Sequence, residues 1–482
     1  MAGVPQSAVR ITLAEAAAAM AAAPGGAAIL AFSGVSIDSR SVRPGELFFA
    51  IRGERFDGHD YVAAALAAGA AGVVVERGRD AAQEAARGAG AAALAVADVR
   101  RALTDLARAR RAALAPTVVG ITGSNGKTTT KELTAAILEE AAGPDAVLRT
   151  GGNLNNDLGV PLTLLRLTPA HRYAVVEMGM SARGEIAALA ALAAPQVGVV
   201  TNVAPAHLEH LGTLANIAHA KGELFAALGP TGRAVLPDDE PLLEAEADAA
   251  AVAAAARYRF GAGAGARARV VALAPAGEAG LDLTLALDGA TVSCRLPLVG
   301  PHNARNAAAA AAAALALGLG PDLIARGLAR GRTAAHRSAV ALVGGRRVID
   351  DCYNANPAST RAALETLTSL RRPGETAVAL LGDMLELGPE GPRLHEEVGA
   401  LAARLGVDHL VVVGALGRAI AAGARAAGLD PARVVEAADA GAAAAAAHGR
   451  TRPGDWVLVK GSRGMRLEAA LEALGRLGGG ER

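Results

Sequence analysis

Short runs of aliphatic residues recur along the chain, and most of them are followed by a polar loop and then by an alanine-rich stretch. Alanine favours helices and β-branched residues favour strands, so the aliphatic runs mark the places where strands are predicted. Continuous apolar strands that alternate with helices are typical of parallel sheets covered on both faces. The pattern therefore predicts an α/β fold, with strands at residues 72–75, 118–122, 174–177, 197–203, 347–350, 377–380, 410–413 and 456–459.

One region departs from this pattern. Residues 281–287 and 291–296 alternate apolar and polar side chains on either side of Asp288 and Gly289, which predicts a hairpin closed by a tight turn. The chain has 482 residues, enough for two to four domains. We predict three domains: residues 1–113, which end in an arginine-rich helix, residues 114–332, which open with the strand at 118, and residues 333–482.

Charge and composition exclude several functions. The chain has 48 basic and 47 acidic residues, a balance unlike that of proteins that bind nucleic acids through a basic surface. Aromatic residues make up 2% of the chain, too few for a platform that stacks bases.

The two cysteines, Cys294 and Cys352, exclude a disulfide scaffold and a zinc site built from clustered cysteines. The longest apolar run, residues 307–317, is shorter than the roughly 20 residues that cross a bilayer. We therefore expect a cytoplasmic protein with no signal peptide, no membrane insertion and no nucleic-acid partner.

Residues 123–129, Gly-Ser-Asn-Gly-Lys-Thr-Thr, have the pattern of a phosphate-binding loop between a predicted strand and a predicted helix. The two glycines permit a tight turn whose N–H groups face a phosphate, and the N-terminus of the helix points to the same place. Lys127 can reach the β- and γ-phosphates, and Thr128 can offer its hydroxyl to Mg²⁺. The usual spacing would place glycine at 121, where this chain has Ile121, so the loop is a shorter variant. A glycine-rich turn beside a surface lysine is the alternative interpretation.

Three further side chains are candidates for a metal site, each with a simpler alternative. Glu177 ends a predicted strand, where an open α/β sheet binds its ligands, and its oxygens suit Mg²⁺. A solvated strand-end carboxylate would look the same. His207 follows the next strand, which we expect to run parallel to the first, but Mg²⁺ prefers oxygen to imidazole. Lys221 lies in a predicted helix, where a solvated lysine paired with an acid is the simpler interpretation.

Taken together, these motifs resemble the Mur ligase family, the ATP-dependent amide ligases of peptidoglycan synthesis, over essentially the whole chain. The phosphate loop and the Ala-Lys-Gly-Glu string at 220–223 are shared by the wider family. The Asn-Leu-Asn-Asn string at 153–156 and the Tyr-Asn-Ala-Asn-Pro string at 353–357 resemble the members that add D-alanyl-D-alanine, and the Asp-Asn-Pro-Arg string of the diaminopimelate-adding members is absent. Further matching segments are residues 38–40, 56–61, 177–179, 207–209, 302–306, 350–352, 382–388 and 460–463.

The resemblance implies a fold of three domains around one ATP site. A smaller N-terminal α/β domain would hold the UDP-muramoyl substrate, a central P-loop ATPase-like parallel sheet would hold ATP and Mg²⁺, and a C-terminal Rossmann-like domain would close over the nucleotide.

The resemblance also implies roles for individual residues. The catalytic set would be Lys127, Glu177, His207 and Lys221. ATP would be bound by Gly123, Ser124, Asn125, Gly126, Lys127, Thr128, Thr129, Asn303, Asn306, Arg337 and Asp351. Mg²⁺ would be held by Thr128, Glu177, His207 and Lys221, the last as a carbamylated lysine. The muramoyl substrate would contact Ser39, Arg40, Asp57, Gly58, His59, Asn153, Asn155 and Asn156.

The implied activity is a peptide ligase that joins D-alanyl-D-alanine to UDP-N-acetylmuramoyl-tripeptide through an acyl phosphate, acting as a monomer. One position departs from the family pattern, because His336 stands where a glycine usually precedes the arginine that corresponds to Arg337. Simpler interpretations of single motifs stay open: Asp57-Gly58 suits a turn, and residues 153–156 suit helix caps. Another Mur-type or folylpolyglutamate-synthetase-like amide ligase, and a non-catalytic nucleotide-binding homologue, are the alternative functions.

Overall fold

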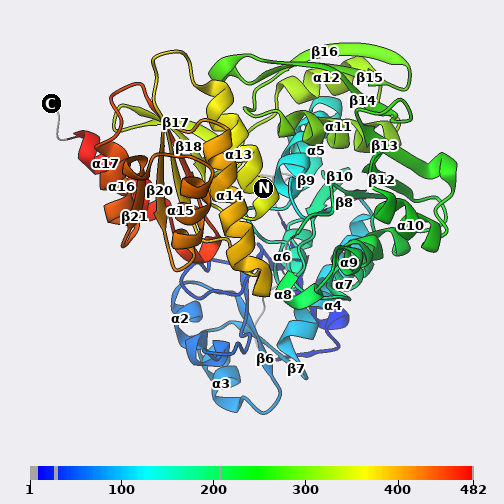
Figure 1. The fold of residues 1–482 in the computed structure, drawn as a ribbon. Helices are drawn as coiled ribbons and strands as arrows, with labels where there is room; N and C mark the ends of the chain where they lie inside the picture. The colour runs from blue at the N-terminus through cyan, green and yellow to red at the C-terminus, as the bar shows by residue number, and fades with distance from the viewer. Residues whose placement is uncertain (1–8, 26–30, 206–207, 480–482) are drawn as a thin grey trace.

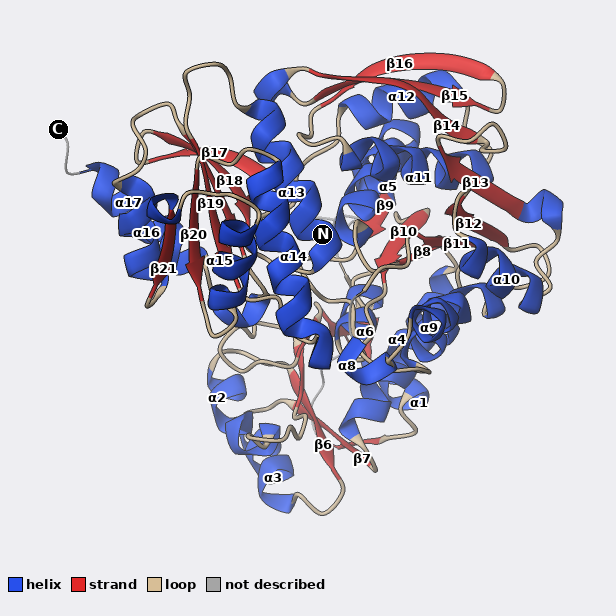
Figure 2. Ribbon diagram, viewed as in Figure 1, coloured by secondary structure: helices blue, strands red, loops and turns tan. Residues whose placement is uncertain are grey.

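The computed structural model describes residues 9–25, 31–205 and 208–479, and in these residues each of three main sheets is formed by its own stretch of the chain (Figure 1). Layers of helices cover the two larger sheets on both faces (Figure 2). Within the described residues, no helix is long and apolar enough to cross a membrane.

The N-terminal domain combines short strands with four α-helices and one 3₁₀ turn. Its five-stranded sheet is parallel apart from the first strand in its spatial order, β2-β7-β6-β5-β4, and β1 pairs with β3 in a separate ribbon. The elements are β1 (Ile11–Thr12), α1 (Leu13–Ala19), β2 (Ala23–Gly25), β3 (Ala31–Phe32), β4 (Val35–Ser36), β5 (Leu47–Phe49), η1 (Gly58–Tyr61), α2 (Val62–Ala67), β6 (Gly72–Glu76), α3 (Asp80–Gly88), β7 (Ala92–Val96) and α4 (Val99–Leu114).

The central domain is built on a nine-stranded sheet with the order β16-β15-β14-β13-β12-β11-β8-β10-β9, in which β14, β15 and β16 pair antiparallel and the other neighbouring strands pair parallel. Its strands are β8 (Thr117–Thr122), β9 (Val147–Arg149), β10 (Tyr173–Glu177), β11 (Val197–Val200), β12 (Arg233–Pro237), β13 (Arg257–Gly261), β14 (Ala268–Pro275), β15 (Leu281–Leu287) and β16 (Ala290–Leu296). Its helices are α5 (Lys127–Ala142), α6 (Gly159–Leu164), α7 (Glu185–Ala193), α8 (Leu208–Leu211), α9 (Leu214–Ala226), α10 (Pro241–Ala249), α11 (His302–Ala316) and α12 (Pro321–Ala329), with 3₁₀ turns η2 (Pro144–Ala146), η3 (Ala254–Ala256) and η4 (Gly277–Ala279).

Strand β8 lies at the place where the strand order of this sheet changes direction. From β8 the chain passes to β9 and β10 on one side and then to β11 and the later strands on the other side. The carboxyl end of β8 is therefore a topological switch point, the place where open α/β sheets bind ligands. Alternate residues of β8 enter two cores: Val118 packs in the core that includes α4, α6, α7 and α9, and Val119 and Ile121 pack in the core of α5, α11 and α12.

The C-terminal domain has a six-stranded sheet, β17-β18-β22-β19-β20-β21, that is parallel apart from its first strand. One core lies between this sheet and α13, α14 and α15, and another lies between the sheet and α16 and α17. The elements are β17 (Ala339–Val343), β18 (Arg346–Asp351), α13 (Pro357–Leu370), β19 (Ala377–Gly382), η5 (Gly388–Glu390), α14 (Gly391–Arg404), β20 (His409–Val413), α15 (Gly417–Ala426), η6 (Pro431–Arg433), β21 (Val434–Ala437), α16 (Ala440–His448), β22 (Trp456–Lys460), η7 (Arg463–Met465) and α17 (Glu468–Gly479).

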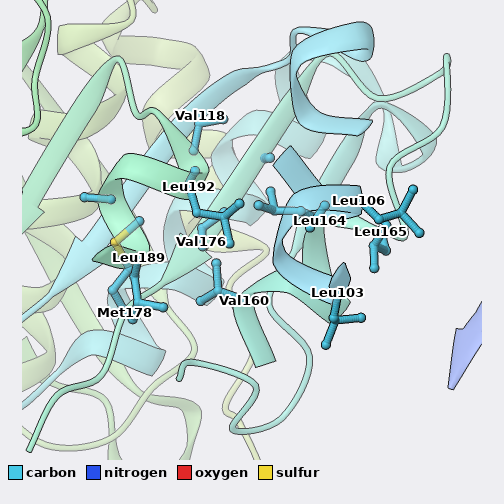
Figure 3. Packing of buried hydrophobic residues seen from close by; sticks show 14 of the residues in the cluster. Leu103, Leu106, Val118, Val160, Leu164, Leu165, Val176, Met178, Leu189 and Leu192 are labelled. Carbon is cyan, nitrogen blue, oxygen red and sulfur yellow. The ribbon is translucent and has the colours of Figure 1, made fainter. Parts of the chain in front are cut away.

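Helix α4 joins the first domain to the second through a shared apolar core. Leu103 and Leu106 of α4 belong to the same buried cluster as Leu164 and Leu165 at the end of α6 (Figure 3). Polar contacts reinforce the packing, because Arg110 donates from Nη2 to the carbonyl of Leu167 at 2.7 Å. The first and second domains therefore share one continuous core.

The predicted strands are confirmed with small shifts at their ends, and the predicted hairpin forms with Asp288 at φ 47° and Gly289 at φ 91°. One strand is shorter than predicted. The run at 197–203 pairs only as far as Val200, because the chain then turns to bind the phosphate loop. Thr201 makes the last backbone hydrogen bond to β8, from its N–H to the carbonyl of Thr122 at 3.0 Å, while its Oγ1 donates to the carbonyl of Asn125 in the loop at 2.5 Å.

Candidate active site

The phosphate loop follows β8 directly and ends where α5 begins, at Lys127. Gly123 and Gly126 both have positive φ, 148° and 78°. A side chain at Gly123 would overlap Thr201 Oγ1, and one at Gly126 would overlap Asn306 Oδ1. Backbone conformation and close packing thus both require glycine at these two positions.

Lys127 lies in the hollow of this loop, where its Nζ donates to the carbonyl of Gly123 at 2.6 Å. Burial lowers the pKa of Lys127 to about 8, although the carboxylate of Glu177 acts in the opposite direction, and the nearby Arg337 lowers the pKa further. A cation held here without an anionic partner in direct contact is suited to bind a phosphate group.

The segment after β11 fixes the shape of the loop. The backbone N–H of Asn125 donates to Oδ1 of Asn202 at 2.9 Å. The hydroxyl of Ser124 donates to the carbonyl of Ala204 at 3.0 Å and accepts from the N–H of Ala204 at the same distance. The loop is therefore held in place before any ligand arrives, as electrostatic preorganisation requires.

Glu177 ends β10, parallel to β8, and its side chain is almost fully buried. Its Oε1 accepts from Nδ2 of Asn155 at 2.9 Å, whereas its Oε2 has no hydrogen-bond partner among the described residues. Oε2 lies 4.0 Å from Nζ of Lys131, which donates at 2.8 Å to the carbonyl of Thr150. A buried carboxylate oxygen without a hydrogen bond is a candidate ligand for a hard cation.

A cavity of about 650 Å³ opens between the central and C-terminal domains over the carboxyl ends of β8 and β10. It is lined by predicted site residues from six parts of the chain: Ser124, Asn125, Gly126, Lys127, Thr129, Asn155, Asn156, Glu177, Asn303, Asn306, Arg337 and Asp351. The fold thus brings most of the predicted phosphate and nucleotide residues together with Glu177, one of the four predicted metal ligands, at the switch point of the sheet.

At the start of α11, two predicted asparagines are buried and hydrogen-bonded to each other. Asn306 donates from Nδ2 to Oδ1 of Asn303 at 2.9 Å, and Asn303 donates from Nδ2 to the carbonyl of Val299 at 2.7 Å. Oδ1 of Asn306 lies against Gly126. These contacts tie the amino end of α11 to the phosphate loop.

The C-terminal domain contributes a buried ion pair to the cavity. Lys460, at the end of β22, donates from Nζ to Oδ2 of Asp351 at 2.5 Å, and Ser338 donates its N–H to Oδ1 of the same residue at 2.9 Å. The guanidinium of Arg337 lies 3.9 Å from the centre of the Tyr353 ring. Arg337 is thereby held on the cavity wall by a cation–π contact.

Lys221, on α9, is almost fully buried, and its ammonium has no hydrogen-bond or ion-pair partner among the described residues. Burial, and to a lesser degree the charge of Lys127, lower the pKa of Lys221 well below its usual value. The cavity lining does not include it. A solvated helical lysine is therefore the wrong interpretation, since this lysine lies inside the protein.

Other predicted residues lie away from the cavity lining. Thr128 is buried in the first turn of α5, Gly123 packs against Thr201, and Asn153 is exposed. His207 lies outside the described residues.

The predicted residues of the first domain do not line this cavity. Asp57 caps η1 and accepts from Nδ1 of the buried His59 at 2.6 Å, while Nε2 of His59 accepts from the N–H of Glu76 at 3.0 Å. Both ring nitrogens thus serve the fold of the domain. Arg40 is exposed and pairs only locally with Asp38, through Nη2 and Oδ2 at 2.6 Å, and Ser39 and Gly58 are its neighbours on the same domain.

Sequence analysis did not assign several residues that shape the site. Thr201 and Asn202 hold the loop, Lys131 lies beside Glu177, and Lys460 and Asn356 come from the C-terminal domain. A polar Thr-Asn pair directly after an apolar strand is the one signal that could have pointed to Thr201 and Asn202.

Comparison with known proteins agrees with this architecture. Profiles described as "Mur ligase family, catalytic domain", "Mur ligase middle domain" and "Mur ligase, glutamate ligase domain" match residues 31–111, 121–314 and 331–463. A UDP-N-acetylmuramoyl-tripeptide--D-alanyl-D-alanine ligase of Escherichia coli is 37% identical, over 80% of this chain and 82% of its own. The ligase of the same name from Bacillus subtilis is 36% identical, over 92% and 93%.

Solved structures extend the likeness to three dimensions. MurF from Acinetobacter baumannii superposes with a TM-score of 0.85 at 32% identity, over 98% of this chain and 100% of that one. The MurF ligase from Thermotoga maritima in complex with ADP gives a TM-score of 0.77 at 29% identity, over 93% and 98%. The Mycobacterium tuberculosis folylpolyglutamate synthase, at 22% identity and a TM-score of 0.61 over 78% and 94%, shares the fold alone.

Fold and site together define an enzyme of the ligase class with three α/β domains and a phosphate loop. The chain belongs to the Mur ligase family.

Proposed function

We propose that this protein joins D-alanyl-D-alanine to UDP-N-acetylmuramoyl-tripeptide at the expense of ATP and so forms the UDP-muramoyl-pentapeptide of peptidoglycan synthesis. The cavity between the central and C-terminal domains carries the proposal, because it combines a preformed phosphate loop with the buried carboxylate of Glu177. The names of the relatives and the ADP held by the Thermotoga maritima ligase support it.

The first step activates the tripeptide. Its terminal carboxylate attacks the γ-phosphorus of ATP, a new oxygen–phosphorus bond forms, and the bond to the β-phosphate oxygen breaks to release ADP. Negative charge is spread over the transferring group, so positioned positive charge is the main requirement. Lys127 supplies an ammonium within the loop, and the N–H groups at the start of α5 point to the same place.

The second step forms the amide. The free amine of D-alanyl-D-alanine attacks the acyl carbon, the carbon–nitrogen bond forms, the carbon–oxygen bond to phosphate breaks, and the amine loses a proton. An acyl phosphate is also attacked by water, so the site has to be enclosed. Residues of both domains line the cavity, and closure of the C-terminal domain would exclude water from it.

The donor set suits Mg²⁺. Oε2 of Glu177 is a buried carboxylate oxygen without a hydrogen bond, and Thr128 offers a hydroxyl one residue after Lys127. These are oxygen donors, which Mg²⁺ prefers. Bound there with Lys221 and His207, the cation would supply positive charge to the phosphates.

We further propose that Lys221 is carbamylated. A lysine reacts with CO₂ only as a neutral amine, and burial, which lowers the pKa of Lys221 well below its usual value, favours that form. The product would be an anion with two oxygens, a suitable ligand for a hard cation. Its negative charge would also be attracted to Lys127, whose charge disfavours an ammonium at this position.

Two substrate assignments complete the proposal. The muramoyl end of the substrate would lie on the first domain near Ser39, Arg40, Asp57, Gly58 and His59, and its peptide would reach Asn153, Asn155 and Asn156. The enzyme would act as a monomer.

One coupled assay tests this function. ADP release is measured with UDP-muramoyl-tripeptide and D-alanyl-D-alanine, each alone and together, and with folate and glutamate as the matched alternative pair. We expect ADP and a ligated pentapeptide only when both muramoyl substrate and dipeptide are present. Nucleotide binding without product from any pair would instead support the non-catalytic alternative.

A further inference from the structure

A second cluster of side chains that could hold a metal ion adjoins, in the chain, two residues of the nucleotide cavity, Arg337 and Asp351. His336 comes from the segment that connects the central and C-terminal domains, and Asp350 and Cys352 come from the end of β18. One ligand atom from each of the three lies within 4.8 Å of the others. Nδ1 of His336 is 2.7 Å from Oδ2 of Asp350, and Sγ of Cys352 is 3.2 Å from Oδ1 of Asp350 and 3.7 Å from Nδ1 of His336.

These distances are close to the dimensions of a tetrahedral metal site. Zinc binds sulfur at about 2.3 Å and nitrogen or oxygen at about 2.0 Å, so ligand atoms on a tetrahedron lie roughly 3.2–3.7 Å apart. The sulfur distances already fall in this range. The imidazole contacts the other carboxylate oxygen, Oδ2, so the carboxylate would have to turn or shift to present one oxygen to the metal, within a cluster whose three ligand atoms already lie within 4.8 Å of one another.

We propose that His336, Asp350 and Cys352 bind a borderline-soft divalent cation such as Zn²⁺, at a site separate from that of Mg²⁺. The chemistry of the donors selects the ion, because one thiolate, one imidazole and one carboxylate suit zinc, whereas Mg²⁺ requires oxygen. Access is from the side of His336, whose side chain is 35% exposed, while Cys352 is buried behind it. Water would complete the coordination at the exposed position.

The thiol must lose its proton when the metal binds. In the metal-free protein, burial and the neighbouring carboxylate of Asp350 raise the pKa of Cys352 far above its usual value, so the group is a neutral thiol that donates to Asp350. Metal binding replaces the sulfur–hydrogen bond with a sulfur–metal bond and releases one proton to solvent. The cluster is not a cysteine nucleophile, which would need a lowered pKa.

A metal bound at this cluster would also restrain the backbone segment that carries Arg337. His336 and Ser338 both have left-handed φ, 60° and 54°, a conformation that costs free energy for residues with side chains. Between them lies Arg337, on the wall of the nucleotide cavity. A cation shared by His336 and β18 would hold this segment, and with it Arg337, on the C-terminal domain.

Cobalt reports directly on this site, because a thiolate bound to Co²⁺ produces a charge-transfer band in the near ultraviolet. The full-length Cys294→Ser protein is titrated with Co²⁺ and then Zn²⁺ in excess Mg²⁺ without nucleotide, so that Cys352 is the sole thiol. We expect a band that saturates at one equivalent and is removed by zinc. His336→Gly and Asp350→Asn should weaken cobalt binding at least tenfold, and Cys352→Ser should abolish the band, while circular dichroism shows that each variant is folded.

Hydrogen exchange provides a second readout that does not depend on the thiol spectrum. Zinc should slow amide exchange in residues 333–338 of the Cys294→Ser protein and leave it unchanged in His336→Gly. No band in the Cys294→Ser protein, or a band of equal affinity in His336→Gly, would overturn the proposal. If Cys352→Ser fails to fold, the comparison of His336→Gly with the Cys294→Ser protein still decides the question.

Discussion

Asn356, at the amino end of α13, donates a hydrogen bond from Nδ2 to Oδ1 of Asn125 in the phosphate loop, over 2.7 Å. The other amide atom of Asn356, Oδ1, accepts from the N–H of Ser359 and caps α13. One side chain therefore starts a helix in the C-terminal domain and contacts the phosphate loop of the central domain. This contact couples the position of the C-terminal domain to the loop that faces the nucleotide.

Substitution of Asn356 by serine separates its two roles. Serine caps helices well but is too short to reach Asn125. A net hydrogen bond contributes about 1 kcal/mol, so the KM for ATP should rise by at most roughly fivefold, and the melting temperature should fall only slightly because α13 keeps its cap. Asn125→Ala removes the same bond from the other side, and the double variant should be no worse than either single variant. Additive effects in steady-state kinetics would show that the bond does not couple the domains.

Lys127→Ala should lower ligation by on the order of a hundredfold or more, because it removes a preorganised charge from the transferring phosphoryl group. The fold should persist, since the Lys127 side chain donates only to carbonyls of its own loop. The measurement is ADP release together with circular dichroism. A folded variant with near wild-type turnover would contradict the assignment.

The low pKa of Lys127 has a defined effect on stability and binding. Its ammonium loses a proton as pH rises through about 8, whereas in the unfolded chain it does so near 10.5. The unfolded state binds more protons between these values, so this group makes the nucleotide-free protein more stable as pH rises from about 8 to 10.5. A triphosphate beside the lysine favours the ammonium, so nucleotide binding at about pH 9 should take up a proton.

Calorimetry of nucleotide binding in two buffers of different ionisation enthalpy measures this uptake. Lys127→Met is the matched variant, because it keeps the length of the side chain and cannot titrate. Proton uptake of the same size in Lys127→Met would assign the effect to another group, with Lys221 as the first to test.

The carbamate on Lys221 predicts chemical rescue. Lys221→Ala should lose most activity, and a short carboxylic acid should restore part of it by filling the vacated space. Wild-type enzyme depleted of CO₂ at mildly acidic pH should lose activity and regain it with bicarbonate. Lys131 provides the control, because it is equally buried but donates to the carbonyl of Thr150, so no carboxylic acid should rescue Lys131→Ala. A fully active Lys221→Ala enzyme would refute the carbamate.

The first domain offers a prediction that separates binding from folding. Arg40 is exposed, so Arg40→Ala should raise the KM for the muramoyl substrate without changing the KM for ATP or the melting temperature. His59 is buried with both ring nitrogens bonded, so His59→Ala should lower the melting temperature instead. A larger rise in the KM for ATP than for the muramoyl substrate in Arg40→Ala would show that this domain does not recognise the sugar nucleotide.

The sequence predicted the parts of the site that depend on local order. The phosphate loop lies between β8 and α5, and Glu177 lies at a strand end, because a strand–loop–helix pattern determines both positions. The contacts of Lys460 could not be predicted in this way, because its partner Asp351 is 109 residues earlier in the chain. Only the pairing of β18 with β22 brings the two together.

Two other features could not be predicted from local sequence: strand β7 and the burial of Lys221. The strand β7, Ala-Ala-Leu-Ala-Val, is too rich in alanine to be recognised by strand propensity, and it forms because it pairs between β2 and β6. The burial of Lys221 could not be predicted either, because a lysine is usually exposed and polar residues, among them His219 and Glu223, lie close to it in the same helix. Tertiary packing decided both cases.

The core shared by α4 and α6 has a mechanical consequence. Relative motion of the first and central domains would have to break continuous apolar packing, whereas the C-terminal domain meets the central one at polar contacts such as Asn356–Asn125 and the ion pair of Arg347 with Glu278, at 2.9 Å. We therefore expect the enzyme to move as two rigid bodies and not as three. Opening and closing should be a rotation about the segment near residue 333, in which the first domain and the phosphate loop move together.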